Sequence, residues 1–367
     1  MDRKRGYYIH FDGIKTSGVA KKIQMQIHEF QKISTIEEIS VEDVPRNLFQ
    51  RIVGLFPLAS ISRKYDEALK KIENPDYVYI RRTVADKGYT DFLKKIKVKY
   101  PDCKIIVEIF TYPYNRDSFG QWNTWPFYFK ELIYRKKLKE AVDRFVTYSR
   151  DKEIYGVPCI STMNGIDLQE VKPVAIHKRD ERKIRMLAVA NFQRHHGYER
   201  VLEGLYKYRG EREFELYLVG EGKEMPKYKR MIRKWHLEDS VYLCGKKLGE
   251  ELDCIYEKAD IALASFGLYK LNISSISTLK TSEYIAKGLP VIAGCSERAM
   301  EESQLPYFKI FVNHRGAIDM EEVVKFYDVI SQKKEEDVIK EIRNYAKEKI
   351  SIDRVLQPII DYIMEEK

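Results

Sequence analysis

The chain has 367 residues, of which 44% are hydrophobic and 33% are charged, and its formal net charge is +9. This length corresponds to about two domains of ~150 residues with a core in each, which excludes a single small domain and a disordered tail protein. No apolar run approaches the ~18–20 residues of a membrane-spanning helix, and the first residues lack the apolar region of a secretory signal, so cytoplasmic residence is expected.

The excess positive charge lies in the first half of the chain. Residues 1–170 hold 30 Lys and Arg against 23 Asp and Glu, a net charge of +7, which leaves +2 for the remainder. A basic half indicates a polyanionic partner, such as nucleic acid, an anionic lipid surface or a phosphorylated acceptor, or else a solvated surface. The five cysteines form no Cys-x-x-Cys pair, which favours a reduced protein without a metal site.

Apolar runs alternate with amphipathic segments along the first half. The predicted strands are Tyr7–Phe11, Tyr77–Ile80, Lys104–Val107 and Phe145–Thr147, and the predicted helices are Val19–Lys32, Asp86–Tyr100 and Trp125–Lys139. The polar, proline-containing stretch 171–182 has no clear period and is the best candidate for a linker.

The second half repeats the alternation more clearly. The predicted strands are Ile184–Ala190, Phe214–Val219, Val241–Leu243, Asp260–Ala264, Val291–Ala293 and Phe308–Val312, and the predicted helices are Tyr198–Tyr208, Pro226–Trp235, Gly249–Lys258, Leu279–Lys287, Glu335–Lys349 and Asp353–Glu366. This pattern predicts an α/β fold with two doubly wound domains, 1–170 and 183–350, facing across a ligand-binding cleft. The last segment, 351–367, is expected to form a helix that packs back on the first domain.

The stretch Ser275–Gly294 is the most informative one for function. Gly288 and Pro290 end the predicted helix, so Lys280 lies in its first turn and Glu283 about one turn later on the same side. A helix N-terminus with a lysine favours an anion, and a carboxylate beside it accepts hydrogen bonds from ribose hydroxyls. The spacing fits one nucleotide, although an ordinary amphipathic surface helix shows the same spacing.

Two features of the first half are candidates for binding a ligand. A predicted strand leads into the tyrosines of Val107–Tyr114, which suit stacking on sugar rings, with a structural loop as the alternative. His10 ends the first predicted strand ahead of a glycine turn, where it either faces the cleft or plays a structural role.

Basic clusters at Lys94–Lys99 and Arg135–Lys139 account for much of the positive charge, and the second follows the aromatic stretch Trp122–Phe129. Aromatic side chains beside cations fit a protein that lies on an anionic membrane. The alternative is a packed helix with a solvated, charged end.

Several of these stretches, taken in order, resemble the family-4 glycosyltransferases, whose GT-B fold has two Rossmann-like domains. Ser282–Ile292 looks like their donor-site segment. Val107–Tyr114 is similar to a stretch in bacterial members that build capsular polysaccharides and exopolysaccharides. The other matching stretches are Ser17–Ala20, Asn164–Asp167, Val189–Leu205, Leu218–Gly222 and Val241–Gly245.

This resemblance implies a retaining hexosyltransferase that moves a hexose from a nucleotide-diphosphate sugar, expected to be a UDP-sugar, to a saccharide acceptor. The sequence contains no Asp-x-Asp motif, so no metal and no cofactor are expected. The acceptor is expected to be linked to polyprenyl diphosphate, which would place the enzyme on the inner face of the membrane in cell-surface polysaccharide biosynthesis. Nucleic acid is not an expected partner. A nucleotide-sugar epimerase of the same fold and a non-catalytic binding protein stay open as alternatives.

The resemblance also implies site residues, with two departures. Family members carry two glutamates eight positions apart, and here Ser275 stands at the first place and Glu283 at the second. Asn191 and His196 stand near the places of an arginine and a lysine that contact the diphosphate, so Arg194 or Lys280 is expected to supply that charge. The expected catalytic residues are Lys280 and Arg194, the donor-binding residues are Glu283, His196, Gly197, Gly220, Ser275 and Leu279, and the acceptor-binding residues are Gly18, His10, Glu108, Tyr112 and Tyr114.

Overall fold

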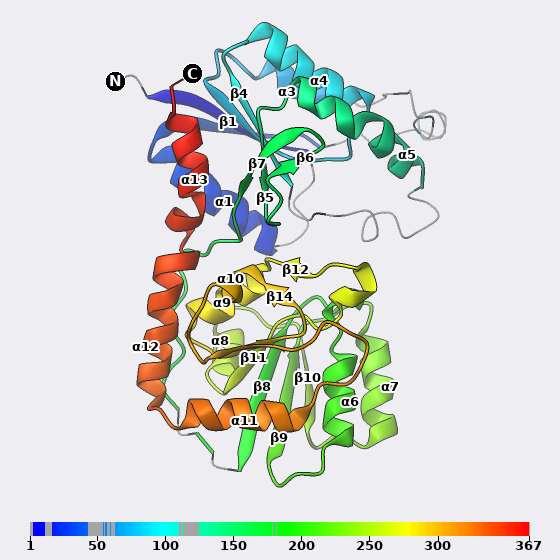
Figure 1. Cartoon of the computed structure of the whole chain (residues 1–367), viewed down its shortest axis with the longest axis vertical. Helices are drawn as coiled ribbons and strands as arrows, with labels where there is room; N and C mark the ends of the chain where they lie inside the picture. The colour runs from blue at the N-terminus through cyan, green and yellow to red at the C-terminus, as the bar shows by residue number, and fades with distance from the viewer. Residues whose placement is uncertain are drawn as a thin grey trace. The chain divides into compact units, whose positions relative to one another are not determined.

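A computed structural model of the chain describes residues 3–11, 17–42, 54, 56, 59, 63–109, 112, 125–177, 179–180 and 182–366. The chain divides into two compact units: Met1–Met163 together with Val355–Lys367, and Asn164–Arg354 (Figure 1). Each unit contains its own parallel sheet with helices packed on it, which confirms the predicted α/β fold of two Rossmann-like domains.

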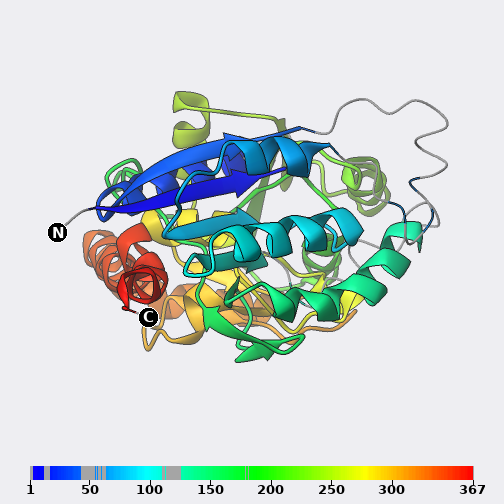
Figure 2. The same ribbon diagram turned by 90° about the horizontal axis from the view of Figure 1, so that it is seen from above.

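The sheet of the first unit runs in the order β2-β1-β3-β4-β5-β7-β6 and is parallel except at the β6–β7 edge pair. The strand order reverses direction at β1, so the ligand-binding position typical of such sheets lies at the carboxyl ends of β1 and β3. Helices α3, α4 and α5 lie side by side (Figures 1 and 2). The strands are β1 (Lys4–His10), β2 (Ser34–Ser40), β3 (Tyr77–Arg81), β4 (Lys104–Ile109), β5 (Arg144–Thr147), β6 (Glu153–Ile154) and β7 (Val157–Ser161), and the helices are α1 (Ser17–Gln31), α3 (Lys64–Lys70), α4 (Lys87–Lys99), α5 (Trp125–Tyr134) and α13 (Ile352–Met364).

Several elements of the first unit differ from the sequence-based expectation: α3, β2, β6 and β7 were not predicted, and one predicted helix is shorter as an α-helix. The predicted helix Trp125–Lys139 ends as an α-helix at Tyr134 and continues as a 3-10 turn over Arg135–Glu140. The strand β2 was not predicted, because its two adjacent exposed glutamates, Glu37 and Glu38, interrupt the alternation of buried and exposed residues.

The sheet of the second unit is parallel and runs in the order β10-β9-β8-β11-β13-β15. Its switch point lies between β8 and β11, where the loops after these strands meet. A separate short pair, β12 with β14, lies next to α10 (Figure 1). The strands are β8 (Lys183–Val189), β9 (Glu213–Val219), β10 (Val241–Gly245), β11 (Ile261–Leu263), β12 (Ser275–Ile276), β13 (Val291–Ala293), β14 (Ser296–Glu297) and β15 (Phe308–Ile310), and the helices are α6 (Glu199–Lys207), α7 (Met225–Trp235), α8 (Glu250–Tyr256), α9 (Leu279–Ala286), α10 (Arg298–Glu301), α11 (Met320–Ser331) and α12 (Glu335–Tyr345).

The chain passes from the first unit to the second between Met163 and Asn164, ahead of the predicted linker at 171–182. The Asn164 backbone N–H donates to Ser277 Oγ, and its side-chain amide donates to the Ser277 carbonyl, both at 2.7 Å. These bonds hold the segment after Met163 in the second unit, so the unit limits differ from the predicted ones at 170 and 183.

The end of the chain lies in the first unit from Val355 onward. Lys104 Nζ at the start of β4 donates to the carbonyls of Tyr362 and Glu365, each at 2.6 Å, which fixes the last turn of α13. In the described ranges, no helix has the length and apolar character needed to span a membrane.

Candidate functional site

The loop after β8 turns sharply at the switch point of the second sheet. Arg194–His196 form a 3-10 turn, and Gly197 follows with a φ of +66°. A Cβ atom at Gly197 would lie 2.4 Å from the backbone N of Gly267 in the loop after β11. Position 197 therefore requires glycine for its conformation and for the close contact between two loops.

The loops around this turn are tied together by one buried arginine. Arg200 in α6 is 1% exposed. Its guanidinium donates to the carbonyls of Phe266, Val312 and Gly316 at 2.9, 3.0 and 2.6 Å. These acceptors belong to the loops after β11 and β15, so Arg200 has a structural role at the site.

Lys280 lies in the first turn of α9, as predicted. Thr278 caps this helix, with its hydroxyl accepting from the backbone N–H of Thr281. Lys280 is partly exposed, and its Nζ donates to Tyr198 Oη at 3.0 Å and lies 5.3 Å from the centre of the Tyr198 ring. Burial of the ammonium lowers the pKa of Lys280 to about 8, partly offset by the Glu297 carboxylate. A cation at a helix N-terminus with partial access to solvent is suited to an anion.

His196, the last residue of the 3-10 turn after β8, is buried. Its Nδ1 accepts from the backbone N–H of Gln193 at 3.0 Å. Burial, with the charge of Lys280 in second place, lowers the pKa of His196, so the ring is neutral and supports the loop. The lysine that the family pattern has here is therefore replaced by a structural group, and a donor contact by His196 stays a prediction.

The remaining predicted donor-site residues lie near α9 or at the carboxyl ends of strands. Glu283 is partly exposed, and its carboxylate together with burial raises the pKa of Tyr256 in α8. Leu279 begins α9, and Ser275 Oγ in β12 donates to Glu301 Oε1 at 2.8 Å. Gly220 follows β9 with a φ of +127°, and a Cβ there would lie 1.9 Å from the Ala190 carbonyl oxygen.

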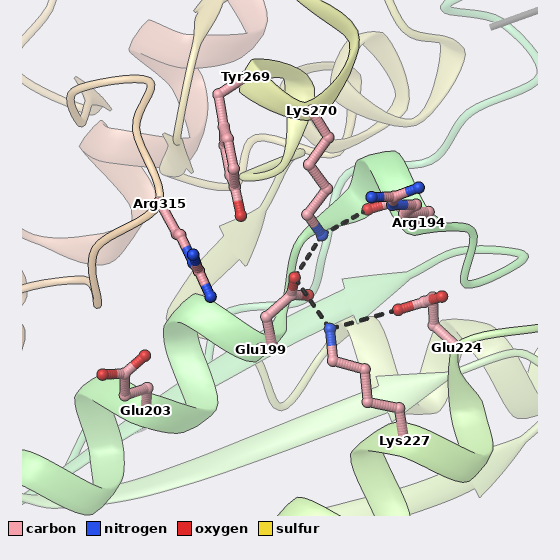
Figure 3. Close-up of a pocket in the computed structure, with 8 residues that line it drawn as sticks. All are labelled: Arg194, Glu199, Glu203, Glu224, Lys227, Tyr269, Lys270 and Arg315. Carbon is pink, nitrogen blue, oxygen red and sulfur yellow. Dashed lines mark hydrogen bonds and ion pairs between the residues drawn. The ribbon is translucent and has the colours of Figure 1, made fainter. Parts of the chain in front are cut away.

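Arg194 lines a cavity of about 740 Å³ at the starts of α6 and α7 (Figure 3). Glu199 Oε1 accepts from Lys227 Nζ at 3.1 Å and from Lys270, whose Nζ also donates to the Arg194 carbonyl at 2.8 Å. In the part of the chain that the structure describes, the Arg194 guanidinium has no hydrogen-bond or ion-pair partner. The lining residues are Arg194, Glu199, Glu203, Glu224, Lys227, Tyr269, Lys270 and Arg315.

None of the other predicted donor-site residues lines this cavity. Lys280 bonds to Tyr198, whereas Arg194 lies beside the ion pairs of α6 and α7 and accepts from Lys270 through its carbonyl. Arg194 and Lys280, the two residues predicted to be catalytic, lie 86 positions apart in the sequence, and no hydrogen bond among the described residues links them.

Of the four predicted acceptor residues that the structure describes, His10 and Glu108 are buried. His10 is 1% exposed, and its Nε2 lies 2.9 Å from Glu38 Oε1. Gly18 is exposed in the first turn of α1, and Tyr112 is partly buried against Tyr155. Tyr114 lies outside the described residues.

Glu108 is completely buried in β4, within a group of charges that the sequence did not reveal. It accepts from Lys22 Nζ at 2.6 Å and from Tyr148 Oη, and Arg81 Nη1 lies 3.5 Å from its other oxygen. Although burial acts in the opposite direction, Lys22 and Arg81 lower the pKa of Glu108 to about 2. These contacts give Glu108 a structural role, and its contact with an acceptor stays a prediction.

The described residues contain no group of three or more His, Cys, Asp or Glu side chains placed to hold a metal ion. The groups that the sequence reasoning missed in the second unit are Tyr198 and Glu297. Both are buried, Tyr198 bonds to Lys280 and Glu297 bonds to Thr278 at the cap of α9, and these contacts form only through folding, so no motif spacing could have revealed them.

The second unit also matches a known family. Residues 183–305 match the sequence family described as Glycosyl transferases group 1. No curated protein sequence matches the chain.

Solved structures match the chain over nearly its whole length. A glycosyltransferase from Rickettsia africae is 14% identical, with 98% of each chain covered and a TM-score of 0.67. Anabaena Alr3699/HepE in complex with UDP is 11% identical, with 98% of this chain and 99% of that chain covered and a TM-score of 0.66. The sucrose-phosphate synthase of Thermosynechococcus elongatus is 12% identical, with 98% of each chain covered and a TM-score of 0.67. At these identities the likenesses show the fold, which is GT-B.

Proposed function

We propose that the chain is a group 1 glycosyltransferase that transfers a hexose from a UDP-sugar to a saccharide acceptor, with retention of configuration and without a metal. The family match over residues 183–305 and the GT-B fold support this proposal. The observation that carries this proposal is Lys280 in the first turn of α9, inside the segment that matches the family. The HepE structure holds UDP, which supports uridine as the nucleotide here.

The chemistry needs positive charge at the leaving group. When the bond between the sugar C1 and the β-phosphate oxygen breaks, negative charge builds on the departing diphosphate. The Lys280 ammonium and the N–H groups at the start of α9 would stabilise that charge, with Arg194 as a second cation. The acceptor oxygen forms the new bond to C1 and gives its proton to a phosphate oxygen of the leaving group, so no separate general base is needed.

A panel of donors tests the proposed function. The purified protein is incubated with UDP- and GDP-sugars, and sugar release and thermal stabilisation are measured. We expect slow hydrolysis of one UDP-sugar in the absence of acceptor. Conversion of a donor to its epimer, or turnover of a GDP-sugar alone, would contradict the assignment.

Glu283→Ala is expected to weaken the binding of free UDP by about tenfold. A charged group that accepts hydrogen bonds from ribose hydroxyls contributes about 1.5–3 kcal/mol, and ~1.4 kcal/mol corresponds to a factor of ten in Kd. Isothermal titration with UDP measures the change, and Glu302→Ala, which removes an exposed carboxylate of the same unit, serves as the control. An unaltered Kd for Glu283→Ala would remove Glu283 from the nucleotide site.

Helix α5 of the first unit carries the features of a membrane contact. Trp125, Phe129 and Ile133 are 48, 48 and 42% exposed and lie four residues apart, so they form one stripe. The opposite side of the helix is fixed by Glu131, which accepts from Arg82 and from the Ala85 backbone N–H. A helix whose buried side is bonded to its own unit and whose exposed side is apolar is suited to insertion into a lipid interface.

Basic residues extend this stripe. Lys136 and Lys137 follow it and are exposed. In contrast, Lys94 and Lys95 of the other basic cluster are paired with Glu140 and Asp66 at 2.5 and 3.0 Å. We infer that α5 and the turn after it face an anionic membrane that presents a polyprenyl-diphosphate-linked acceptor, in the synthesis of a cell-surface polysaccharide.

The double variant Lys136→Ala/Lys137→Ala is expected to reduce binding to anionic liposomes about tenfold or more, because each lysine near such a surface contributes ~1 kcal/mol. Co-sedimentation with and without anionic lipid measures the effect. The matched control is Lys94→Ala/Lys95→Ala, which removes the same charge from ion-paired positions. Equal losses for both double variants would indicate a non-specific charge effect.

A further inference from the structure

Glu297 is a carboxylic acid buried behind the first turn of α9. It ends β14, is 0% exposed, and accepts from the Thr278 hydroxyl at 3.1 Å through Oε1. Its Oε2 is buried and has no hydrogen-bond partner. Because Thr278 is the N-cap of α9, the carboxyl group is attached directly to the turn that carries Lys280.

In the part of the chain that the structure describes, Lys280 has no charged hydrogen-bond partner. Among the described residues, its one hydrogen-bond partner is the Tyr198 hydroxyl, which is neutral because burial holds the pKa of Tyr198 well above its usual value. The positive end of the α9 dipole also disfavours an ammonium in the first turn. A partly buried lysine in this position needs a counter-charge to stay protonated.

Glu297 is a buried carboxyl group bonded to the cap of the same turn, and is therefore placed to supply that counter-charge. Burial lowers the pKa of Lys280 to about 8, and the carboxylate of Glu297 is the largest influence in the opposite direction. In turn, burial raises the pKa of Glu297 to about 7, against the effect of Lys280. Among the described residues, the buried titratable groups around the pair include His196, Tyr198, Tyr284 and Cys295, which are neutral in this pH range because burial shifts each of their pKa values towards the neutral form.

We propose that Glu297 is the positioning residue of Lys280, a buried counter-charge that keeps the ammonium protonated at the start of α9 for the diphosphate of the donor. The link to the diphosphate rests on the proposed function, whereas the link between Glu297 and Lys280 does not. The experiment therefore has two arms, one without nucleotide and one with UDP.

The first arm titrates Lys280 directly. The side-chain NMR signal of Lys280 in lysine-labelled protein, assigned with Lys280→Arg, is followed between pH 6 and 10. In Glu297→Gln the midpoint is expected to fall by about 1 pH unit or more, because a nearby opposite charge shifts a pKa by ~1–3 units. Glu297→Asp keeps the charge and is expected to stay near the wild type.

The matched control is Glu301→Gln. Glu301 lies on the adjacent helix α10 but is bonded to Ser275 and Ser296 rather than to the α9 cap. It is expected to leave the Lys280 midpoint in place. An unchanged midpoint in Glu297→Gln, or an equal shift in Glu301→Gln, would overturn the proposal.

The second arm measures the Kd of UDP against pH. Lys280 is charged below its pKa, so affinity is full at low pH and is lost as pH rises through that value. Glu297→Gln is expected to bind like the wild type at pH 6 and at least fivefold more weakly at pH 8. A loss that is equal at every pH would show a structural role only and would overturn the proposal. Failure of the wild type to bind UDP, with the NMR shift present, would reject the nucleotide site but keep the pairing.

Discussion

Replacing Lys280 by alanine is expected to lower kcat by about 10²-fold or more while the fold is retained. Loss of one group that stabilises transition-state charge typically costs 10²–10³ in kcat, or ~2.7–4 kcal/mol. Lys280 sits at the start of α9 with its ammonium held by Tyr198 and with part of its surface open to solvent. The measurement is steady-state transfer or donor hydrolysis with the UDP-sugar found in the donor panel.

The distribution of this effect between kcat and KM identifies the role of the lysine. If the ammonium interacts with charge that develops on the departing diphosphate, kcat and kcat/KM fall together. If it only binds the ground-state diphosphate, KM rises and kcat is kept. We expect the first pattern, because the charge on the leaving group increases as the sugar–phosphate bond breaks.

Lys287→Ala is the matched control for this variant. Lys287 lies seven positions further along, at the C-cap of α9, and its Nζ forms an ion pair with Asp253 Oδ1 at 2.7 Å. Its loss removes the same charge from the same helix at the end far from the proposed diphosphate site. Equal activity of Lys280→Ala and wild type would remove Lys280 from the mechanism, whatever the effect of Lys287→Ala.

The central strands β11 and β13 of the second unit could be predicted from the sequence because all of their residues are buried. Such strands appear as continuous apolar runs, and Val291–Ala293 in β13 was predicted at its observed limits. The strand β2 was missed for the converse reason, since it lies at the edge of the first sheet and exposes adjacent glutamates. Edge strands carry a weaker pattern than central ones.

The part of the candidate site that lies on a single helix, α9, could be predicted from the sequence. Gly288 and Pro290 after the helix placed Lys280 in the first turn of α9, and the structure confirms this position. Glu297 lies seventeen residues later in the sequence and reaches the α9 cap only because β14 pairs with β12. Contacts between irregular loops leave no periodic pattern of apolar residues in the sequence. For the same reason the sequence could not assign Arg194 to its cavity.

Glu108→Ala is expected to destabilise the first unit by about 3–5 kcal/mol, the largest stability effect that we expect in this chain. The substitution leaves Lys22 and Arg81, which are 6 and 8% exposed, as buried charges without their shared carboxylate. Removing one partner of a buried ion pair costs this much because the remaining charge is not compensated. Hydrogen exchange at the amides of β4 and β5 measures the loss in the first unit by itself.

A double variant separates the charge effect from the loss of packing. In Lys22→Met/Glu108→Leu the carboxylate and the ammonium are removed together, so the protein is expected to be more stable than Glu108→Ala alone. If the double variant is as unstable as the sum of the two single changes, then Lys22 and Glu108 do not act as a pair.

The pH dependence provides an independent measurement of the same ion pairs. The pKa of Glu108 is lowered from 4.5 to about 2, so its stabilising contribution is fully present above pH ~5 and is lost as pH falls towards 2. Wild-type protection at β4 should therefore decrease over this range more steeply than that of Glu108→Ala, which lacks the group. Parallel pH profiles for the two proteins would mean that Glu108 is not ionised in the folded unit, and that the contacts with Lys22 and Arg81 contribute little to its stability.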